Sequence, residues 1–198
     1  MITISQETID RISVLLSEVP KGTERALSNA ANRAIAKART ETFKGVTSEY
    51  KITKKVISEY TKDSIKNATT SDLCATLIFA GKQIPLYKYS LTKPKHPGKG
   101  KVFAGQKTAV ALEHAFRNWV SDEKEGIFER TGRFHYVEHK KTGKIRYREI
   151  IKQLMGSSMR SMVSNAVVME QVYKEAQETF DTRIEHEIER LLAGYGGK

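Results

Sequence analysis

The sequence predicts an α+β fold, in which N-terminal helices and a long C-terminal helix pack on a small, mainly antiparallel β-sheet. Three observations support this class. Apolar residues recur at helical spacing over the first 44 residues and again over residues 157–192. Between residues 64 and 150 the period changes to two, as in strands. Thr142-Gly143 lies at the centre of an alternating segment and marks a tight turn.

The length of 198 residues corresponds to about one domain, and we expect residues 1–198 to form a single α+β domain. A domain of this size buries roughly 70% of its unfolded surface, so it needs no disulfide or metal to fold. The single cysteine, Cys74, excludes an internal disulfide and is typical of a protein made in a reducing compartment. The hydrophobic fraction of 39% and charged fraction of 29% favour an extended shape or large subunit contacts.

Three helices are predicted in the N-terminal part. Residues 1–20 contain an amphipathic helix over 5–18. A second helix covers about 23–44, and its mostly alanine stripe allows another element to approach closely. We expect Gly45 to end this helix. A third, shorter helix begins at Thr53, but the turn before it is longer than that of a helix-turn-helix DNA-binding motif.

The central segment is predicted to form strands. Its expected elements are paired strands at 64–69 and 73–80, an extended segment at 84–89, a strand at 102–104, and a segment at 109–119 that fits either a helix or a strand. Cys74 falls in the second of these strands, and we expect it to be a buried structural thiol.

A basic hairpin is predicted from two arms, 134–138 and 144–150. The two-residue period of a strand gathers the cations of the second arm on one face, opposite Ile145 and Tyr147. Residues 92–101 form a mobile basic loop, because Pro, Gly and Lys dominate them. The candidate residues facing a DNA channel or a partner protein are Lys93, Lys95, Lys99, Lys101, Lys140, Lys141, Lys144, Arg146 and Arg148.

The last predicted element is a helix over 157–192, with Ser157 or Ser158 in the position of its N-cap. One straight rod of that length would extend for about 50 Å. This exceeds what a compact domain of this size can cover. We therefore expect the helix either to break near 164–169 or to reach over a neighbouring subunit.

The net charge of +11 is unevenly distributed. Residues 170–190 contain seven acidic and three basic residues, a net charge of −4, so the remainder carries +15. A basic body with an acidic terminal helix indicates either a nearby polyanion or head-to-tail self-association through opposite charges. A solvated surface with a salt-bridged helix is the equally weighted alternative.

No catalytic, cofactor or metal motif is found in the sequence. His135 and His139 lie about 13 Å apart if they are on a strand, too far to share a zinc ion. Glu129-Arg130 is better explained as an exposed or interface ion pair than as a catalytic pair. We therefore expect no enzyme activity and no cofactor. Without a signal peptide or an apolar run near the ~20 residues of a membrane span, we expect a soluble protein with no membrane partner.

Three short motifs resemble the phage minor tail protein Z family, the tail-completion proteins of long-tailed phages and prophages. They are Gly81-x-x-Ile-Pro-Leu86, Gly126-Ile-Phe-Glu-Arg130 and Ile151-x-Gln-Leu-x-Gly-x-Ser158, the last followed by an apolar helix. The similarity covers about residues 24–192. The motif residues assigned a structural or interface role by this resemblance are Ile84, Pro85, Gly126, Phe128, Arg130, Gln153, Leu154, Gly156 and Ser158.

The resemblance implies an α+β subunit of a homo-oligomeric ring, expected to be a hexamer, at the head–tail junction. Such a late structural protein would finish the tail or join it to the capsid, with genomic DNA passing through the ring axis. Its expected partners are other neck and tail proteins: head-closure, tail-terminator and tube proteins. Its expected locations are the virion and, during assembly, the host cytoplasm.

Two other classes remain open at the level of the sequence. A cytosolic, sequence-independent nucleic-acid-binding protein would bind as an isolated monomer with steep salt dependence. An enzyme, such as a metal-free nuclease or toxin, would lose activity on a single change at Glu129, Arg130 or His135.

Overall fold

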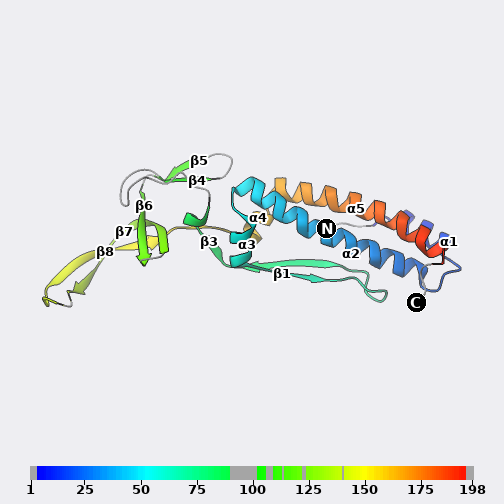
Figure 1. Ribbon diagram of the computed structural model, residues 1–198, viewed down its shortest axis with the longest axis horizontal. Coiled ribbons are helices and arrows are strands. Elements are labelled where there is room, and N and C mark those ends of the chain that lie inside the picture. The colour runs from blue at the N-terminus through cyan, green and yellow to red at the C-terminus, as the bar shows by residue number, and fades with distance from the viewer. Residues whose placement is uncertain are drawn as a thin grey trace. The chain divides into compact units, whose positions relative to one another are not determined.

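A computed structural model of the chain describes residues 4–89, 102–105, 109–112, 114–121, 124–139 and 141–194 (Figure 1). The contacts between residues divide the chain into two compact units. Unit 1 comprises residues 1–46, 61–80 and 160–198, and unit 2 comprises residues 47–60 and 81–159. The predicted α+β class is confirmed, but the strands form several small sheets rather than one.

Three helices form the core of unit 1. They are α1 (Gln6–Leu15), α2 (Gly22–Tyr50) and α5 (Ala166–Leu192), which lie side by side in Figure 1. The small residues of α2 allow close packing, and the buried cluster between the helices contains Ile12, Leu16, Ala26, Leu27, Ala30, Ala34, Phe180, Ile184, Ile188 and Leu191. The first helix begins at an N-cap, where the Ser5 side chain accepts a hydrogen bond from the Thr8 backbone N–H.

The prediction that Gly45 ends the second helix is wrong, since α2 continues to Tyr50. A Cβ built at Gly45 would lie 3.2 Å from Cγ1 of Val168, so this glycine permits close approach of α2 and α5. The helix is followed instead by Lys51, whose φ of 48° is in the left-handed region.

The predicted C-terminal helix is broken, which is one of the two alternatives that the sequence left open. A short helix α4 (Met159–Val163) follows directly after Ser158, and α5 begins after Asn165. The Asn165 side chain caps α5 by accepting a hydrogen bond of 3.0 Å from the Val167 N–H. The apolar stripe of α5 is buried against α1 and α2 of its own chain, so packing of this helix does not need a neighbouring subunit.

A pair of strands, β1 (Thr61–Lys66) and β2 (Thr76–Gly81), lies along α2 in Figure 1. Asn32 of α2 fixes the connecting loop, because its side-chain amide both donates to the Ala68 carbonyl (2.9 Å) and accepts from the Ala68 N–H (2.7 Å). The loop is longer than predicted, and Cys74 is exposed in it, contrary to the expected buried strand position. The Asp72 carboxylate accepts the Cys74 N–H and so holds this residue in a turn ahead of β2.

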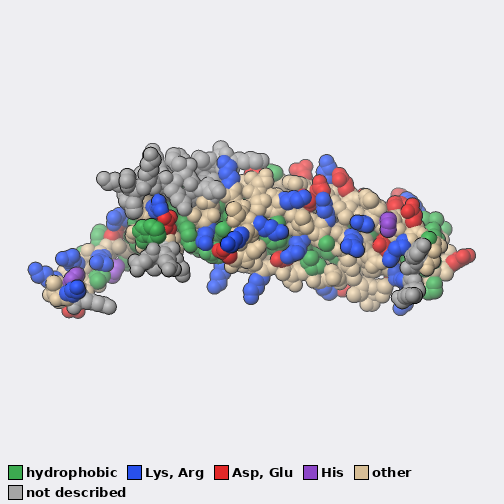
Figure 2. All heavy atoms as spheres, viewed as in Figure 1, with side chains coloured by type: hydrophobic (Ala, Val, Ile, Leu, Met, Phe, Trp, Pro, Cys, Tyr) green, Lys and Arg blue, Asp and Glu red, His purple; other side chains and the backbone are tan. Residues whose placement is uncertain are grey.

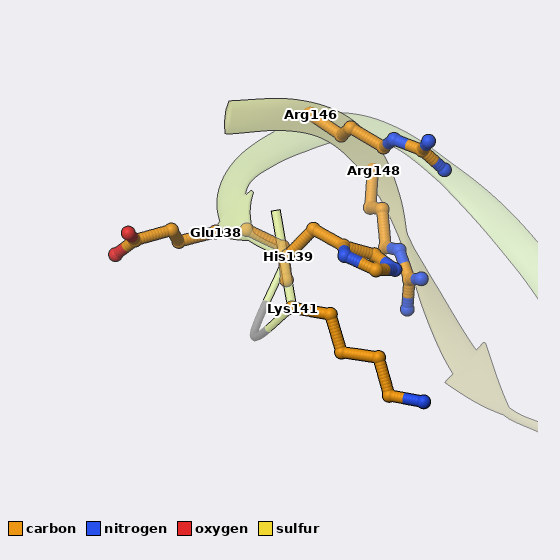
Figure 3. Close-up of a pocket in the computed structure, with 6 residues that line it drawn as sticks. Glu138, His139, Lys141, Arg146 and Arg148 are labelled. Carbon is orange, nitrogen blue, oxygen red and sulfur yellow. The ribbon is translucent and has the colours of Figure 1, made fainter. Parts of the chain in front are cut away.

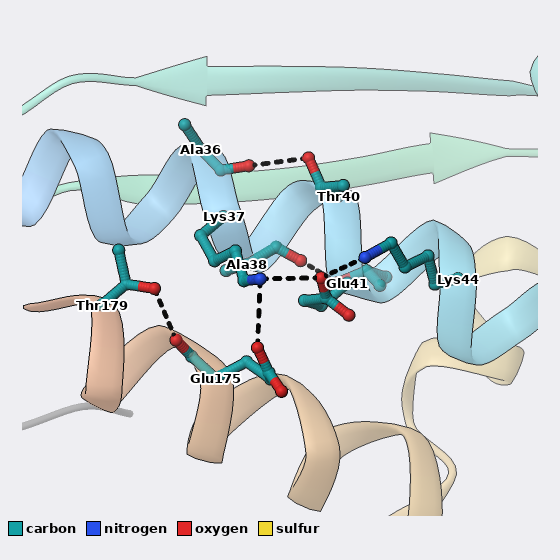
Figure 4. A network of polar contacts seen from close by, with 9 residues as sticks. Ala36, Lys37, Ala38, Thr40, Glu41, Lys44, Glu175 and Thr179 are labelled. Atoms are coloured by element: carbon teal, nitrogen blue, oxygen red, sulfur yellow. Dashed lines mark hydrogen bonds and ion pairs between the residues drawn. The ribbon is translucent and has the colours of Figure 1, made fainter.

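A polar network connects α2 and α5 inside unit 1 (Figure 4). The side chain of Glu41 is only 4% exposed, and its carboxylate pairs with Lys44 at 2.7 Å and Lys37 at 3.1 Å. Lys37 also reaches Glu175 of α5 at 3.1 Å. The hydrogen bond from Lys44, with that from Lys37, lowers the pKa of Glu41 against the opposing effect of burial.

Unit 2 contains one α-helix, α3 (Lys54–Tyr60), and a set of short sheets among its described residues. A first sheet pairs β3 (Gln83–Pro85) with β9 (Met155–Ser158), and the 3-10 helix η1 (Leu86–Lys88) follows β3. A second pairs β4 (Val102–Gly105) with β5 (Ala109–Leu112). The third has the order β6-β7-β8, from Ala115–Ser121, Lys124–Glu138 and Ile145–Gln153. In the ambiguous segment 109–119, residues 109–112 belong to β5 and residues 115–119 belong to β6.

Among the described helices, none combines the length and the hydropathy that a membrane span requires.

Candidate interaction surface on the β7–β8 hairpin

The three sequence motifs meet in unit 2, although 64 residues lie between the first and the third in the chain. The antiparallel β3–β9 pair joins the first motif to the third, with Gln83 opposite Ser158 and Pro85 opposite Met155. The backbone of Leu154 then connects all three, because its carbonyl accepts from the Leu86 N–H (3.1 Å) and its N–H donates to the Ile127 carbonyl (2.8 Å). We call residues 83–89, 126–128 and 153–158 the motif junction.

The motif junction is held by a close contact between Tyr89 and Gly156. The Tyr89 hydroxyl donates to the Ser157 carbonyl at 3.0 Å, and its ring occupies the space where a Gly156 side chain would be. Burial raises the pKa of Tyr89 to about 12, so the phenol remains a protonated donor at neutral pH.

The burial of the motif residues indicates a structural role for most of them. Ile84, Pro85, Gly126 and Phe128 are buried. The half-buried members are Gln153, Leu154, Gly156 and Ser158. Arg130 differs from the others, because its side chain is 63% exposed and lies at the edge of the junction, where the hairpin begins.

A bulge separates the base of the hairpin from its outer part. Arg130 pairs with Ile151 and Phe134 with Glu149, so three residues of β7 lie opposite one of β8. Gly132 in this bulge has a φ of 69°, which favours glycine. Glu149 closes the bulge by accepting from the Gly132 N–H (3.1 Å) and pairing with the Arg130 guanidinium (2.8 Å).

Beyond the bulge, the hairpin has two unlike faces, set by its register. Tyr136 is opposite Tyr147, and His135 is opposite Arg148. Since side chains at paired positions share a face, one face, the aromatic face, contains Phe134, Tyr136, Glu138, Ile145 and Tyr147. The other, the cationic face, contains His135, Val137, His139, Arg146 and Arg148. This confirms the predicted separation of Arg146 and Arg148 from Ile145 and Tyr147.

The tip of the cationic face is hollowed. A cavity of about 350 Å³ is lined there by Val137, Glu138, His139, Lys141, Arg146 and Arg148. Figure 3 shows the side chains of His139, Lys141, Arg146 and Arg148 extending to one side, whereas the Glu138 carboxylate points to the other. In Figure 2, Lys, Arg and His side chains gather at this end of the hairpin. The hollow therefore offers several hydrogen-bond donors and positive charge to an anionic group.

The hairpin tip is closed by the predicted turn. The Gly143 N–H donates to the His139 carbonyl at 2.9 Å, Gly143 has a φ of 63°, and the His139 N–H donates to the carbonyl of Lys144 at 3.0 Å. Of the nine candidate basic residues, the structure brings Lys141, Lys144, Arg146 and Arg148 together at this tip. The candidates Lys93, Lys95, Lys99, Lys101 and Lys140 lie outside the described residues.

The suggested Glu129-Arg130 pair does not form. Neighbouring residues of a strand point to opposite faces, so Arg130 pairs across the sheet with Glu149 and its guanidinium lies 5.3 Å from the Phe116 ring centroid. Among the described residues, no three His, Cys, Asp or Glu side chains are grouped so that they could hold a metal ion.

The aromatic face was not among the sequence-based candidates. Its exposed fractions are 60% for Phe134, 67% for Tyr136, 69% for Ile145 and 64% for Tyr147. The two-residue spacing of Phe134 and Tyr136 was available in the sequence. It fits core and surface equally well, since only the pairing partners and the bulge determine whether a strand face is covered.

No family model matches the chain, and comparisons with curated proteins and with solved structures find no match.

Proposed function

We propose that this chain is a structural subunit of the neck or tail of a long-tailed phage or prophage, acting in tail completion and head–tail joining as part of a homo-oligomeric ring. The proposal starts from the resemblance of the three motifs to the minor tail protein Z family. Its predicted ring order is six, its predicted neighbours are head-closure, tail-terminator and tube proteins, and genomic DNA passes through the ring without sequence-specific contacts.

The observation that supports the proposal best is the outer β7–β8 hairpin. Both of its faces are exposed, yet one is aromatic and the other cationic. A two-stranded ribbon of this kind is at best marginally stable alone in water, and large exposed apolar side chains mark contact surfaces. Both features are expected of a subunit whose outer hairpin is covered by other subunits in an assembly.

The organisation of the motif residues also supports a structural role. They hold the base of the hairpin through backbone hydrogen bonds and the Tyr89–Gly156 contact. The excess of positive charge, +11 for the chain, suits a ring around DNA, since lysine and arginine neutralise phosphates independently of sequence.

Deletion of the gene from the phage or prophage genome that encodes it tests the proposal. We expect filled heads and unjoined or unfinished tails by electron microscopy, with joined particles restored by the gene in trans. Joined particles of normal titre without the gene would overturn the proposal.

A sequence-independent nucleic-acid-binding protein outside the virion is the alternative, favoured by the hollow among Lys141, Arg146 and Arg148. It predicts DNA binding by the monomer, and replacement of Arg146 and Arg148 by Gln should reduce the slope of log K against log salt by about 2. The same change at the exposed Lys54 and Lys55 is the charge-matched control. The tail proposal instead predicts that the two arginine changes impair assembly more than DNA affinity.

A further inference from the structure

The outer hairpin presents a preformed aromatic platform. The ring centroids of Tyr136 and Tyr147 lie 4.3 Å apart, and the Phe134 ring packs edge-on against Tyr147 at 6.5 Å. The two tyrosine hydroxyls also share a hydrogen bond, which raises the pKa of Tyr147. The exposed rings are therefore ordered against one another across the two strands, and within the described part of the chain no element covers them.

The opposite face of the same ribbon is complementary to this platform. Arg146 and Arg148 are two residues apart on β8, a spacing of about 7 Å along a strand. Phe134 and Tyr136 have the same two-residue spacing on β7. A guanidinium group stacks favourably on an aromatic ring, and arginine does so more often than lysine. Inside unit 2, Arg117 approaches Trp119 in this way, at 5.9 Å from the ring centroid.

Charge is complementary at the tip as well. Glu138 belongs to the aromatic face, and its carboxylate points away from Arg146, Arg148 and Lys141 (Figure 3). Among the described residues no ion pair holds Glu138. One face of the ribbon therefore combines rings with a carboxylate, and the other combines arginines with Lys141.

We propose that the cationic face of one copy's hairpin stacks on the aromatic face of the hairpin of a second copy. This inference rests on the proposed function, whose ring requires a contact between neighbouring subunits. Because the complementary surfaces are opposite faces of one ribbon, each copy contacts one neighbour through its cationic face and another through its aromatic face. Such a head-to-tail contact closes into a ring or continues as a filament, unlike a symmetric dimer contact.

The size of the contact determines its role. Five residues of each strand extend for about 17 Å, so the buried area is well below the roughly 1,200–2,000 Å² of a stable protein–protein interface. The stacked hairpins therefore align neighbouring copies that other surfaces also hold. The contact must be measured in the assembled ring, because it is too small to maintain a dimer alone.

Crosslinking between two single-cysteine variants of the full chain tests the proposal. Both carry Cys74→Ser; one adds Ile145→Cys on the aromatic face and the other adds His135→Cys on the cationic face, so the rings of Phe134, Tyr136 and Tyr147 and both arginines are retained. Stacked sheets lie about 10 Å apart, beyond the Cα separation of a disulfide, so a short bis-maleimide is the appropriate crosslinker. The sample is the ring preparation identified by electron microscopy.

We expect covalent dimers in the mixture of the two variants and few in either variant alone. Replacement of Arg146 and Arg148 by Gln in both should reduce the yield about five- to tenfold, while Lys54→Gln with Lys55→Gln leaves it unchanged. If the Ile145→Cys variant alone crosslinks as strongly as the mixture, the proposal is overturned in favour of a symmetric contact between two aromatic faces.

Two further results also overturn it. One is efficient crosslinking of His135→Cys with Glu178→Cys, which would place the cationic face against α5 of another copy. The other is the absence of a hairpin crosslink in intact rings. This result would overturn the proposed hairpin contact but would not contradict the proposed function. Absence of rings together with normal particle assembly after gene deletion would instead contradict the proposed function itself.

Discussion

Gly156 has no side chain, and the Tyr89 ring fills the space in which one would lie. A Cβ built at this glycine is 2.6 Å from the ring carbon Cε2. Tyr89 is only 6% exposed and its hydroxyl is held by Ser157, so the ring cannot move aside without losing a hydrogen bond.

We therefore predict that Gly156→Ala destabilises unit 2 by about 1–3 kcal/mol, the usual cost of overpacking. Chemical denaturation followed by near-ultraviolet circular dichroism measures the change. Met155→Ala on the same strand is the control, because the Met155 side chain is 41% exposed. Equal stability of Gly156→Ala and the native chain would show that the Tyr89 contact does not hold the junction.

Glu41 gives unit 1 a defined response to acid. Its pKa is lowered in the folded chain from an ordinary value of 4.5, so its charged form stabilises the fold above that pH. This contribution decreases as the pH falls from about 4.5 through the lower folded pKa.

We predict that Glu41→Gln costs about 1–3 kcal/mol of unfolding free energy at pH 7 and flattens the dependence of stability on pH below 4.5. Glu178→Gln, on the exposed side of α5, should change neither quantity. Denaturation curves at a series of pH values provide the measurement. Parallel pH profiles for Glu41→Gln and the native chain would contradict this account of the network.

At the scale of the element, Glu149 determines how firmly the outer hairpin is attached. Its carboxylate accepts from Gly132 in the bulge and pairs with Arg130. Because Arg130 is largely exposed, we expect Glu149→Gln to weaken the outer hairpin by only about 0.5–1 kcal/mol. Amide exchange of residues 134–138 should accelerate about two- to fivefold. Glu138→Gln is the matched control, and identical exchange in both variants would argue against a role of Glu149 in the bulge.

The helices were more predictable than the sheets, because helix signals are local. The stripe of apolar residues predicted α5, and a break near 164–169 was one of the two alternatives that the length of the predicted helix left open. The extension of α2 past Gly45 was missed, because a glycine reads locally as a helix end, whereas this one lies close to Val168, more than 100 residues away in sequence.

The hairpin was predicted from its alternation and its Thr142-Gly143 turn, and the separation of Arg146 from Tyr147 followed from the period of a strand. The bulge at Gly132 and the exposure of the aromatic face were not predictable. They depend on which residues of β7 and β8 pair, and a two-residue pattern alone does not determine that register.

At the scale of the whole molecule, the two-faced hairpin predicts that charge on the cationic face controls assembly. Reversal of Arg146 and Arg148 to Glu should reduce ring formation, and the yield of joined particles, by at least about tenfold, since stacking or ion pairing with another copy would become repulsive. The same reversal at Lys54 and Lys55 should have little effect. Sedimentation and particle counts report the two quantities. Unchanged assembly in the arginine variant, at low salt included, would contradict the role of this face.

The most direct test of a structural role in the tail is a cryo-electron microscopy reconstruction of the neck of purified particles. The account predicts several copies of this chain in a ring around the axial channel, with the β7–β8 hairpin of each copy against its neighbour. Complete, joined particles that contain no copy of the chain would contradict it.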